Sequence, residues 1–178
     1  MTHHTHVTFS LSSLLFLMIG AIEIWGVIFN YTNFGVLLAG VVLGSLLPDI
    51  DEPESYIGKR TLFIANVLKS CFGHRGMLHR FIVPFSLLVV AIFLSLPYSL
   101  FVFGVFFGYL FHILGDMLTK GGVKGVFYPF GSVERAYGIL PKRFRFYTNS
   151  SIEKLLNFML GIFLIIELFL LLVKGSIL

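Results

Sequence analysis

Long apolar stretches alternate with polar segments along this 178-residue chain. A helix that crosses the hydrocarbon core of a bilayer needs about 20 mostly apolar residues. The stretch 81–118 is too long for one such helix, and Pro97 within it favours a reversal of the chain between two helices. The pattern therefore predicts an all-α, polytopic membrane protein with about five transmembrane helices, at 9–29, 34–47, 81–96, 98–118 and 155–173.

Polar segments connect these helices. Residues 30–33, NYTN, are typical of a tight turn. The segment 49–80 contains an apolar pattern at 62–72 that predicts a short amphipathic helix at the membrane surface. Residues 120–154 form a second, basic loop. We therefore expect two helical hairpins and a final span in a single domain, 1–178.

The hairpins return the chain to the side on which it starts, so the N-terminus and both polar loops share one side of the membrane. Twelve of the thirteen Lys and Arg residues lie in or beside these loops, and Lys174 is the exception. By the positive-inside rule this side is cytoplasmic. We expect a multi-pass plasma-membrane protein whose N-terminus is cytoplasmic and whose C-terminus lies on the opposite side.

The composition supports a membrane protein. Hydrophobic residues make up 57% of the chain and charged residues 12%, and the mean hydropathy is +0.92, which is too apolar for a soluble globular domain. The net charge of +4 reflects the bias of the loops, so nucleic acid is not an expected partner. Cys71 is the single cysteine, which excludes an internal disulfide and a multi-cysteine zinc site. The first residues do not resemble a cleavable signal peptide.

Most of the acidic and imidazole side chains fall in three short runs, LLPDIDEPES (46–55), GHRGMLH (73–79) and GYLFHILGD (108–116). Ionisable groups beside bilayer-spanning sequence are costly, which indicates a function. Each run contributes one pair of candidate metal ligands: Asp49 and Asp51, His74 and His79, and His112 and Asp116.

The spacing within each pair suits a shared site. The two aspartates flank one residue after a helix-ending proline and can point at neighbouring metals, although a solvated loop start is the alternative. Gly76 lets the backbone fold back and bring its two flanking histidines together. His112 and Asp116 are four residues apart, which places them on one face of a helix. A histidine alone on an apolar helix is more often a core residue.

Imidazole and carboxylate ligands without thiolate suit zinc, with manganese or iron as alternatives. The set exceeds what one tetrahedral zinc needs, so two or three ions bridged by an aspartate are expected. Such a site activates water and binds the oxygens of a phosphoryl displacement. Arg75, between two histidines, is the best candidate for holding phosphate. Topology and anionic-lipid attraction offer another explanation for the basic residues.

The expected depth of the site indicates the kind of substrate. His112 precedes Lys120 by eight residues, which is about 12 Å of helix. The second span, 34–47, is about 21 Å long against a hydrocarbon core of about 30 Å. Both observations predict a site sunk into the cytoplasmic leaflet and an amphiphilic substrate. Glu23 and Glu167 lie within spans, and their partners cannot be identified from the sequence.

Together, LLPDIDEPES with IGKR (57–60), FGHRGMLH (72–79) and GYLFHILGDMLTKGGV with FYPF (108–130) resemble the YdjM-like family of inner-membrane, metal-dependent hydrolases. The resemblance extends from His6 to about Leu156 and is specific as a combination. The family commonly has Thr and Ser where this chain has Leu78 and Arg80. Both histidines of that motif remain, so metal ligation by them is still expected. A supporting role for the missing Thr and Ser hydroxyl groups is not.

The resemblance implies further site residues. HVTFSL (6–11) resembles the N-terminal histidine motif of the family, so His6, which is ambiguous on spacing alone, becomes an expected ligand. YTNSSIEKLL (147–156) resembles a later family segment with a glutamate near the start of the last helix, so Glu153 becomes an expected site residue. An acid in the first turn of a helix is also favourable in itself. The order of the metal ligands along the chain in this family is also weakly similar to that in the zinc-dependent phospholipase C and nuclease superfamily. That similarity would imply phosphodiester hydrolysis. Some family members are under DNA-damage control, which says nothing of the substrate.

The preferred interpretation is a membrane-bound, metal-dependent, presumed zinc hydrolase acting on a phosphoester of a lipid or other amphiphile. Its expected metal ligands are His6, Asp49, Asp51, His74, His79, His112 and Asp116, and its expected catalytic residues are Asp51, Glu153 and Arg75. Expected partners are membrane lipids and an amphiphilic phosphorylated substrate. One alternative is metal-ion transport, which would require polar residues throughout the spans. Another is a non-catalytic protein whose metal holds the hairpins together.

Overall fold

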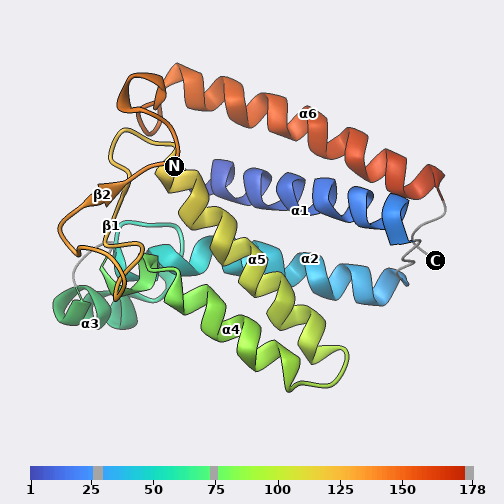
Figure 1. Cartoon of the computed structure of the whole chain (residues 1–178), viewed down its shortest axis with the longest axis horizontal. Coiled ribbons are helices and arrows are strands. Elements are labelled where there is room, and N and C mark those ends of the chain that lie inside the picture. The colour runs from blue at the N-terminus through green and yellow to red at the C-terminus, as the bar shows by residue number, and fades with distance from the viewer. Residues whose placement is uncertain (26–29, 73–75, 175–178) are drawn as a thin grey trace.

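The computed structural model describes residues 1–25, 30–72 and 76–174. Its long helices run between two ends of the molecule (Figure 1). They are α1 (His3–Trp25), α2 (Tyr31–Leu46), α3 (Leu62–Phe72), α4 (Ile82–Ile92), α5 (Tyr98–Met117) and α6 (Ser151–Val173). Short 3₁₀ helices lie at Leu47–Asp51, Gly58–Arg60, Met77–His79 and Lys142–Phe144.

Four of the described segments are long and apolar enough to cross a membrane, namely His3–Trp25, Tyr31–Asp51, Tyr98–Met117 and Ser151–Val173. The expected all-α, multi-span class is therefore confirmed. The span expected at 81–96 is the shorter helix α4, whose 11 residues extend about 16 Å and fall short of a hydrocarbon core of about 30 Å. The chain reverses ahead of Pro97, a residue that disfavours helical backbone at Leu96, and α4 packs against α5.

The second span is longer than expected. Residues 30–33 do not form a separate turn, because the side chain of Asn30 accepts a hydrogen bond of 2.7 Å from the backbone N–H of Asn33 and caps α2. At the other end, the 3₁₀ helix Leu47–Asp51 continues the span, with Pro48 in its first turn, where proline is tolerated. Because the second span is not short, its length gives no support to the prediction that the site is sunk into the membrane.

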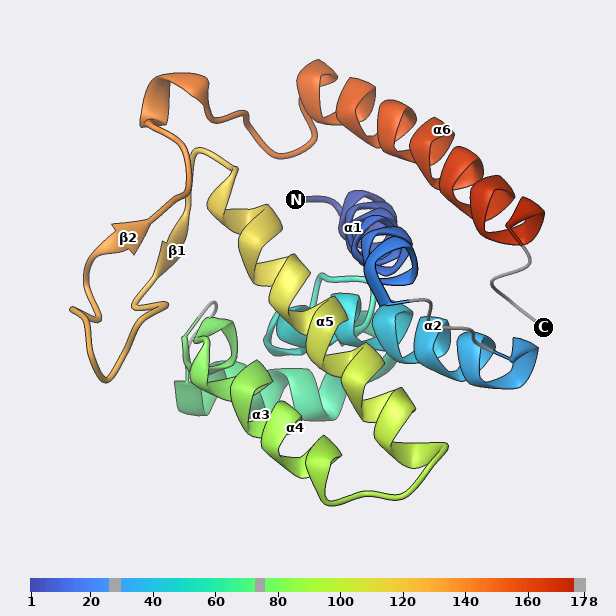
Figure 2. The same ribbon diagram turned by 45° about the vertical axis from the view of Figure 1, so that its right-hand side comes forward.

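Helices α2 and α5 cross at very close range (Figure 2). Gly40 and Gly44 of α2 face Gly104 and Gly108 of α5. A Cβ atom added at Gly108 would lie 2.1 Å from the carbonyl oxygen of Val41, so a larger residue would push the helices apart. Small residues four apart are a common basis of close packing between membrane helices, and here they determine how α5 lies on α2.

Helices α1 and α6 lie side by side (Figures 1 and 2). Polar side-chain contacts join them, among them Thr8 to Asn157 at 2.5 Å, Ser12 to Glu167 at 2.9 Å, and an ion pair between Glu23 and Lys174. These contacts supply the partners of the two mid-span glutamates. An apolar core lies where α1, α2 and α6 meet, and it includes the buried side chains of Leu15, Val41 and Leu171.

The described parts of the two long polar loops lie at one end of the helices (Figure 1). Helix α3 has the predicted bounds 62–72. The second loop contains a small antiparallel ribbon that an all-α pattern does not predict. Its strands β1 (Val123–Lys124) and β2 (Ala136–Tyr137) pair Val123 with Tyr137. The N-terminal end of α1 lies at this same end of the molecule, next to the last turns of α5.

Candidate metal site

Five of the predicted ligands meet at this end of the molecule. They come from four different segments: His6 from the first turn of α1, Asp49 from the 3₁₀ helix after α2, His79 from the 3₁₀ helix before α4, and His112 and Asp116 from the last turns of α5. The fold thus assembles the site from residues up to 110 positions apart in the sequence.

His6, His112 and Asp116 form a first group of potential ligands, whose ligand atoms lie within 4.8 Å of one another. His6 Nε2 lies 3.2 Å from Asp116 Oδ1. The rings of His6 and His112 stack with their centroids 3.6 Å apart and their planes 8° apart. The α-amino group of Met1 also forms an ion pair with Asp116 Oδ1. All three side chains are buried.

Asp49, His79 and His112 form a second group of the same size. Asp49 Oδ1 lies 3.7 Å from His79 Nε2 and 3.6 Å from His112 Nε2. The other oxygen of Asp116, Oδ2, lies 3.8 Å from His79 Nε2 and 3.9 Å from His112 Nε2. His112 therefore belongs to both groups. The two oxygens of Asp116 face different neighbours, as in a bridging carboxylate.

A hydrogen bond to a backbone carbonyl of α2 orients the shared histidine. His112 Nδ1 donates to the carbonyl oxygen of Ser45 at 2.7 Å. This bond places the proton on Nδ1 and leaves the Nε2 lone pair directed at Asp49 and Asp116. Metal-binding histidines are commonly oriented in this way. Because Ser45 follows Gly44, the glycine contact between α2 and α5 also positions this histidine.

Tyr109, which the sequence did not single out, positions the turn that carries His79. Its hydroxyl group donates a hydrogen bond of 2.6 Å to the carbonyl oxygen of Leu78. Tyr109 lies on α5, one turn before His112, and is buried. The backbone at the unusual Leu78 position is therefore fixed by α5, whatever the side chain there. Arg80 places its guanidinium carbon 4.3 Å from the ring centre of Tyr128.

The donor set fits zinc. Ligand atoms around a tetrahedral zinc ion, at about 2.0–2.1 Å from it, would lie about 3.3 Å from each other. The five carboxylate-to-imidazole distances range from 3.2 to 3.9 Å, and all but one exceed an ordinary hydrogen bond of about 2.7–3.2 Å. These side chains thus surround common points and leave room for an ion.

Glu153 lies outside both ligand groups. Its side chain is buried, Oε1 accepts a hydrogen bond of 2.6 Å from the backbone N–H of Thr2, and Oε2 accepts one of 2.6 Å from that of Asn149. Ser150 caps α6 by accepting from the backbone N–H of Glu153. Glu153 therefore joins the first residues of α1 to the start of α6, and this contact gives it a positioning role.

The structure says less about the three remaining predicted site residues, Asp51, His74 and Arg75. Asp51 is fully buried in the same 3₁₀ helix as Asp49, but it is not a member of either group. His74 and Arg75 lie outside the described residues. Their roles, and that of Asp51 in ligation or catalysis, stay predictions from the sequence.

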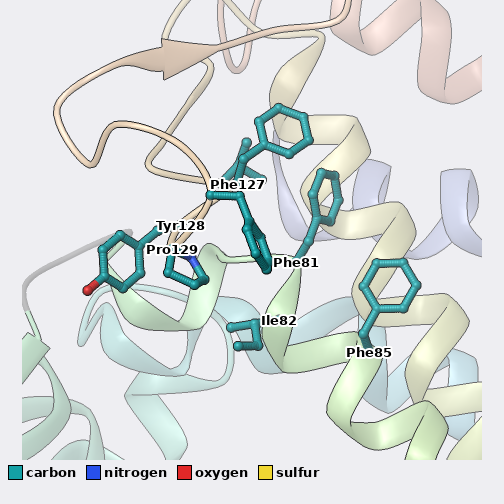
Figure 3. A pocket seen from close by; sticks show the side chains of 8 residues that line it. Phe81, Ile82, Phe85, Phe127, Tyr128 and Pro129 are labelled. Atoms are coloured by element: carbon teal, nitrogen blue, oxygen red, sulfur yellow. The ribbon is translucent and has the colours of Figure 1, made fainter.

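An apolar cavity of about 350 Å³ lies beside the turn that carries His79. Figure 3 shows Phe81, Ile82 and Phe85 at the start of α4 facing Phe127, Tyr128 and Pro129 of the second loop. The backbone N–H of Phe81 donates to the carbonyl oxygen of Val126 at 3.0 Å, which holds the two segments together. The side chains that line this cavity are apolar or aromatic.

Membrane-length helices that enclose a buried cluster of histidines and aspartates at one end define a multi-pass membrane protein with a candidate metal site. Residues 1–175 match the family model described as YdjM inner membrane protein. The chain belongs to this family, and the resemblance seen in its motifs is confirmed at that level.

Curated relatives carry the same family name or no assigned activity. The inner membrane protein YdjM of Escherichia coli strain K12 is 40% identical over 92 residues, which cover 49% of this chain and 46% of the relative. The protein of the same name from Shigella flexneri matches equally. The uncharacterized protein YvsG of Bacillus subtilis strain 168 is 30% identical over 93 residues, 52% of this chain and 57% of the relative. The matched part thus spans about half the length of these relatives, and no solved structure matches the chain.

Proposed function

We propose that this protein is a membrane-embedded, zinc-dependent hydrolase that cleaves a phosphoester of a lipid-like substrate. The observation that carries the proposal is the relation between the two ligand groups. They share His112, and the two oxygens of Asp116 face different neighbours. Two zinc ions at a site of this kind supply a nucleophile from water at neutral pH and neutralise charge on a phosphoryl group.

The protein residues would prepare the site for this chemistry. His112 is held by Ser45 with its Nε2 directed at both acids. Burial excludes bulk water from the site and strengthens its electrostatic interactions. Asp49 is the ligand with an exposed edge, at 22% exposure of its side chain, so the site has an opening. That opening favours catalysis over a metal that only holds hairpins together.

The far side of the site argues against ion transport. Beyond His112, the core cluster centred on Leu15, Val41 and Leu171 is apolar, and these three side chains are at most 1% exposed. The buried serines of α1 are paired within the protein, Ser10 with the Gly108 carbonyl oxygen and Ser12 with Glu167. An ion pathway would need polar groups along that route. The buried Glu167 is hydrogen-bonded to Ser12 and joins α6 to α1.

We further propose that the site faces the cytoplasm, since the basic loops lie at the same end as the ligands. The substrate is then a phosphorylated amphiphile of the inner leaflet. Among the candidate substrates, phospholipids combine a phosphoester with an apolar portion that suits helices of membrane length.

Metal analysis coupled to activity tests the proposal. The purified protein, in vesicles of phosphatidylethanolamine and phosphatidylglycerol, would be analysed for bound metals and assayed against lipid phosphoesters and water-soluble phosphate esters. Bound zinc with lipid turnover that is lost in Asp49→Asn and kept in the exposed control Glu134→Gln supports the hydrolase. Bound zinc without turnover of any phosphoester supports a structural metal. Cleavage of water-soluble esters alone contradicts the lipid substrate.

A further inference from the structure

The metal site reaches the surface at one of its ligands. The side chains of the other four members of the two groups are at most 1% exposed, whereas that of Asp49 is 22% exposed. The hydroxyl group of Ser55 donates a hydrogen bond of 2.7 Å to the backbone carbonyl oxygen of Asp49, and the next residue, Tyr56, stacks on His3 of the first turn of α1. A molecule that approaches the described ligands therefore meets them at the edge formed by Asp49 and His3.

A cavity of about 380 Å³ lies at this edge, between α1 and α2. This volume falls within the range of small-molecule sites, about 300–1,000 Å³. Its polar lining is formed by His3, His4, Thr8, Tyr56 and Asn157, and its apolar lining by Val7 of α1 and by Val42 and Leu46 of α2. The cavity thus has polar groups toward the start of α1 and an apolar wall on α2.

A cation, Arg60, is held against Tyr56, one of the polar lining residues. The ring of Tyr56 stacks on that of His3, with centroids 4.7 Å apart and planes 17° apart. The guanidinium carbon of Arg60 lies 3.8 Å from the centre of the Tyr56 ring, and Arg60 Nη1 donates a hydrogen bond of 2.8 Å to the Tyr56 carbonyl oxygen. A guanidinium group fixed in this way is well suited to bind a phosphate.

The apolar end opens toward the bilayer. Both α1 and α2 belong to segments that can cross a membrane, and Val42 is exposed on the outer surface of α2. On the other side, the hydrogen bond between Thr8 and Asn157 joins α1 to α6 beside the cavity. A ligand that enters from the lipid phase would lie along the groove between α1 and α2 and reach Asp49 with its polar end.

We infer that this cavity is a lipid-binding groove for an anionic phospholipid. The groove holds the phosphate group at its polar end, beside His3 and Arg60, and one acyl chain along its apolar walls. The inference rests on the proposed function, because it assigns the substrate class and the direction of approach for the same metal site. Charge complementarity and the apolar walls together select a phospholipid over a soluble phosphate ester.

Photo-crosslinking of a lipid tests the inference on the full chain. The protein would be placed in phosphatidylcholine vesicles that contain phosphatidylglycerol with a diazirine on one acyl chain, and the labelled residues would be mapped by mass spectrometry. We expect labelling at Val7, Val42 and Leu46. Val42→Trp fills the groove and should lower this labelling about tenfold. A second substitution, Arg60→Gln, should remove the preference for phosphatidylglycerol over a phosphatidylcholine probe.

The apolar cavity of Figure 3 provides a matched control. Ile82→Trp adds the same side chain at a residue of similar character outside the groove, and it should leave labelling at α1 and α2 unchanged. Zinc content of each variant shows whether the metal site has formed, so a loss of labelling in misfolded protein is recognised. Val42→Phe, a smaller change, repeats the test if Val42→Trp loses its zinc.

The outcomes separate the groove from the hydrolase. Labelling of the groove that Val42→Trp abolishes, without turnover of any lipid, supports the groove and contradicts the hydrolase. Lipid hydrolysis that persists in Val42→Trp contradicts the groove and leaves the hydrolase standing. Labelling spread evenly over the outer surfaces of α1 to α6, or a crosslinked dimer through α2 in place of lipid adducts, overturns the inference.

Discussion

His112 Nδ1 donates a hydrogen bond of 2.7 Å to the backbone carbonyl of Ser45, and this contact connects helix packing to the candidate metal site. Ser45 follows Gly44, one of the glycines at which α2 and α5 meet. The distance between these two helices therefore determines whether the shared histidine can face both acids. The consequence is that substitutions remote from any ligand should change metal binding.

Gly108→Ala tests this connection. The added methyl group would lie 2.1 Å from the carbonyl oxygen of Val41, so α5 would have to move away from α2. We expect a loss of about 1–3 kcal/mol in the free energy of unfolding and a zinc affinity lower by about 10–100-fold. Thermal unfolding in detergent and zinc titration measure the two effects.

Gly161→Ala on α6 is the matched control, because a Cβ atom there meets nothing within 4 Å. Alanine is the better helix former, so this variant should be at least as stable as the original protein. Equal zinc affinity in the two alanine variants would contradict a link between the helix contact and the site.

The two ligand groups predict a hierarchy of metal loss. His6 belongs to one group and His112 to both. If the original protein binds about two zinc ions, His6→Ala should retain about one and His112→Ala fewer than one, because removal of the shared ligand weakens both positions. Metal content per chain, measured by mass spectrometry after dialysis, checks the order. Equal losses in the two variants would contradict a shared ligand.

The positions of most helices could be predicted because apolar periodicity is a local property. Helix α5, predicted at 98–118, spans Tyr98–Met117, and α3 has its predicted bounds. The boundaries of α2 were missed because they depend on individual hydrogen bonds, such as the cap by Asn30. A helix was predicted at 81–96, but the early end of α4 at Ile92 was missed, because an apolar run does not indicate where a helix within it ends.

The meeting of the ligands could also be predicted, since the topology places their segments at one end. The detailed arrangement could not. A backbone carbonyl such as that of Ser45 is present at every residue, so its pairing with His112 leaves no mark in the sequence. The glycine contact depends on two helices about 65 positions apart. The contacts of Glu153 agree with the structural alternative to a catalytic role, namely an acid in the first turn of a helix.

Glu153→Gln should therefore destabilise the protein. Both carboxylate oxygens accept backbone N–H groups, from Thr2 and Asn149, and an amide offers only one acceptor and turns an N–H donor toward the other. The loss of one charged hydrogen bond costs about 1.5–3 kcal/mol. Glu153→Gln and Glu153→Ala should show similar losses in chemical unfolding. A Gln variant of unchanged stability with no turnover would instead support the catalytic role expected from the sequence.

Tyr109→Phe should loosen the turn that carries His79. The substitution removes the hydroxyl group that donates to the Leu78 carbonyl oxygen at 2.6 Å and keeps the ring. We expect a stability loss of about 1 kcal/mol and weaker zinc binding at the group that contains Asp49. Tyr98→Phe, at an exposed position at the start of α5, is the control. Zinc titration of both variants checks the prediction, which fails if the two affinities agree.

The last prediction concerns the orientation of the chain in the membrane. Helices α1 and α6 both run away from the ligand-bearing end (Figure 1), and the ion pair between Glu23 and Lys174 joins their far ends. With the basic loops on the cytoplasmic side, a reporter fused after Leu178 should report the opposite, non-cytoplasmic side. A reporter inserted beside Glu134, in the second loop, should be cytoplasmic. An alkaline phosphatase and green fluorescent protein pair distinguishes the two sides. Two cytoplasmic signals would contradict the proposed topology, because the second loop before α6 and the chain end after it would then lie on the same side of the membrane.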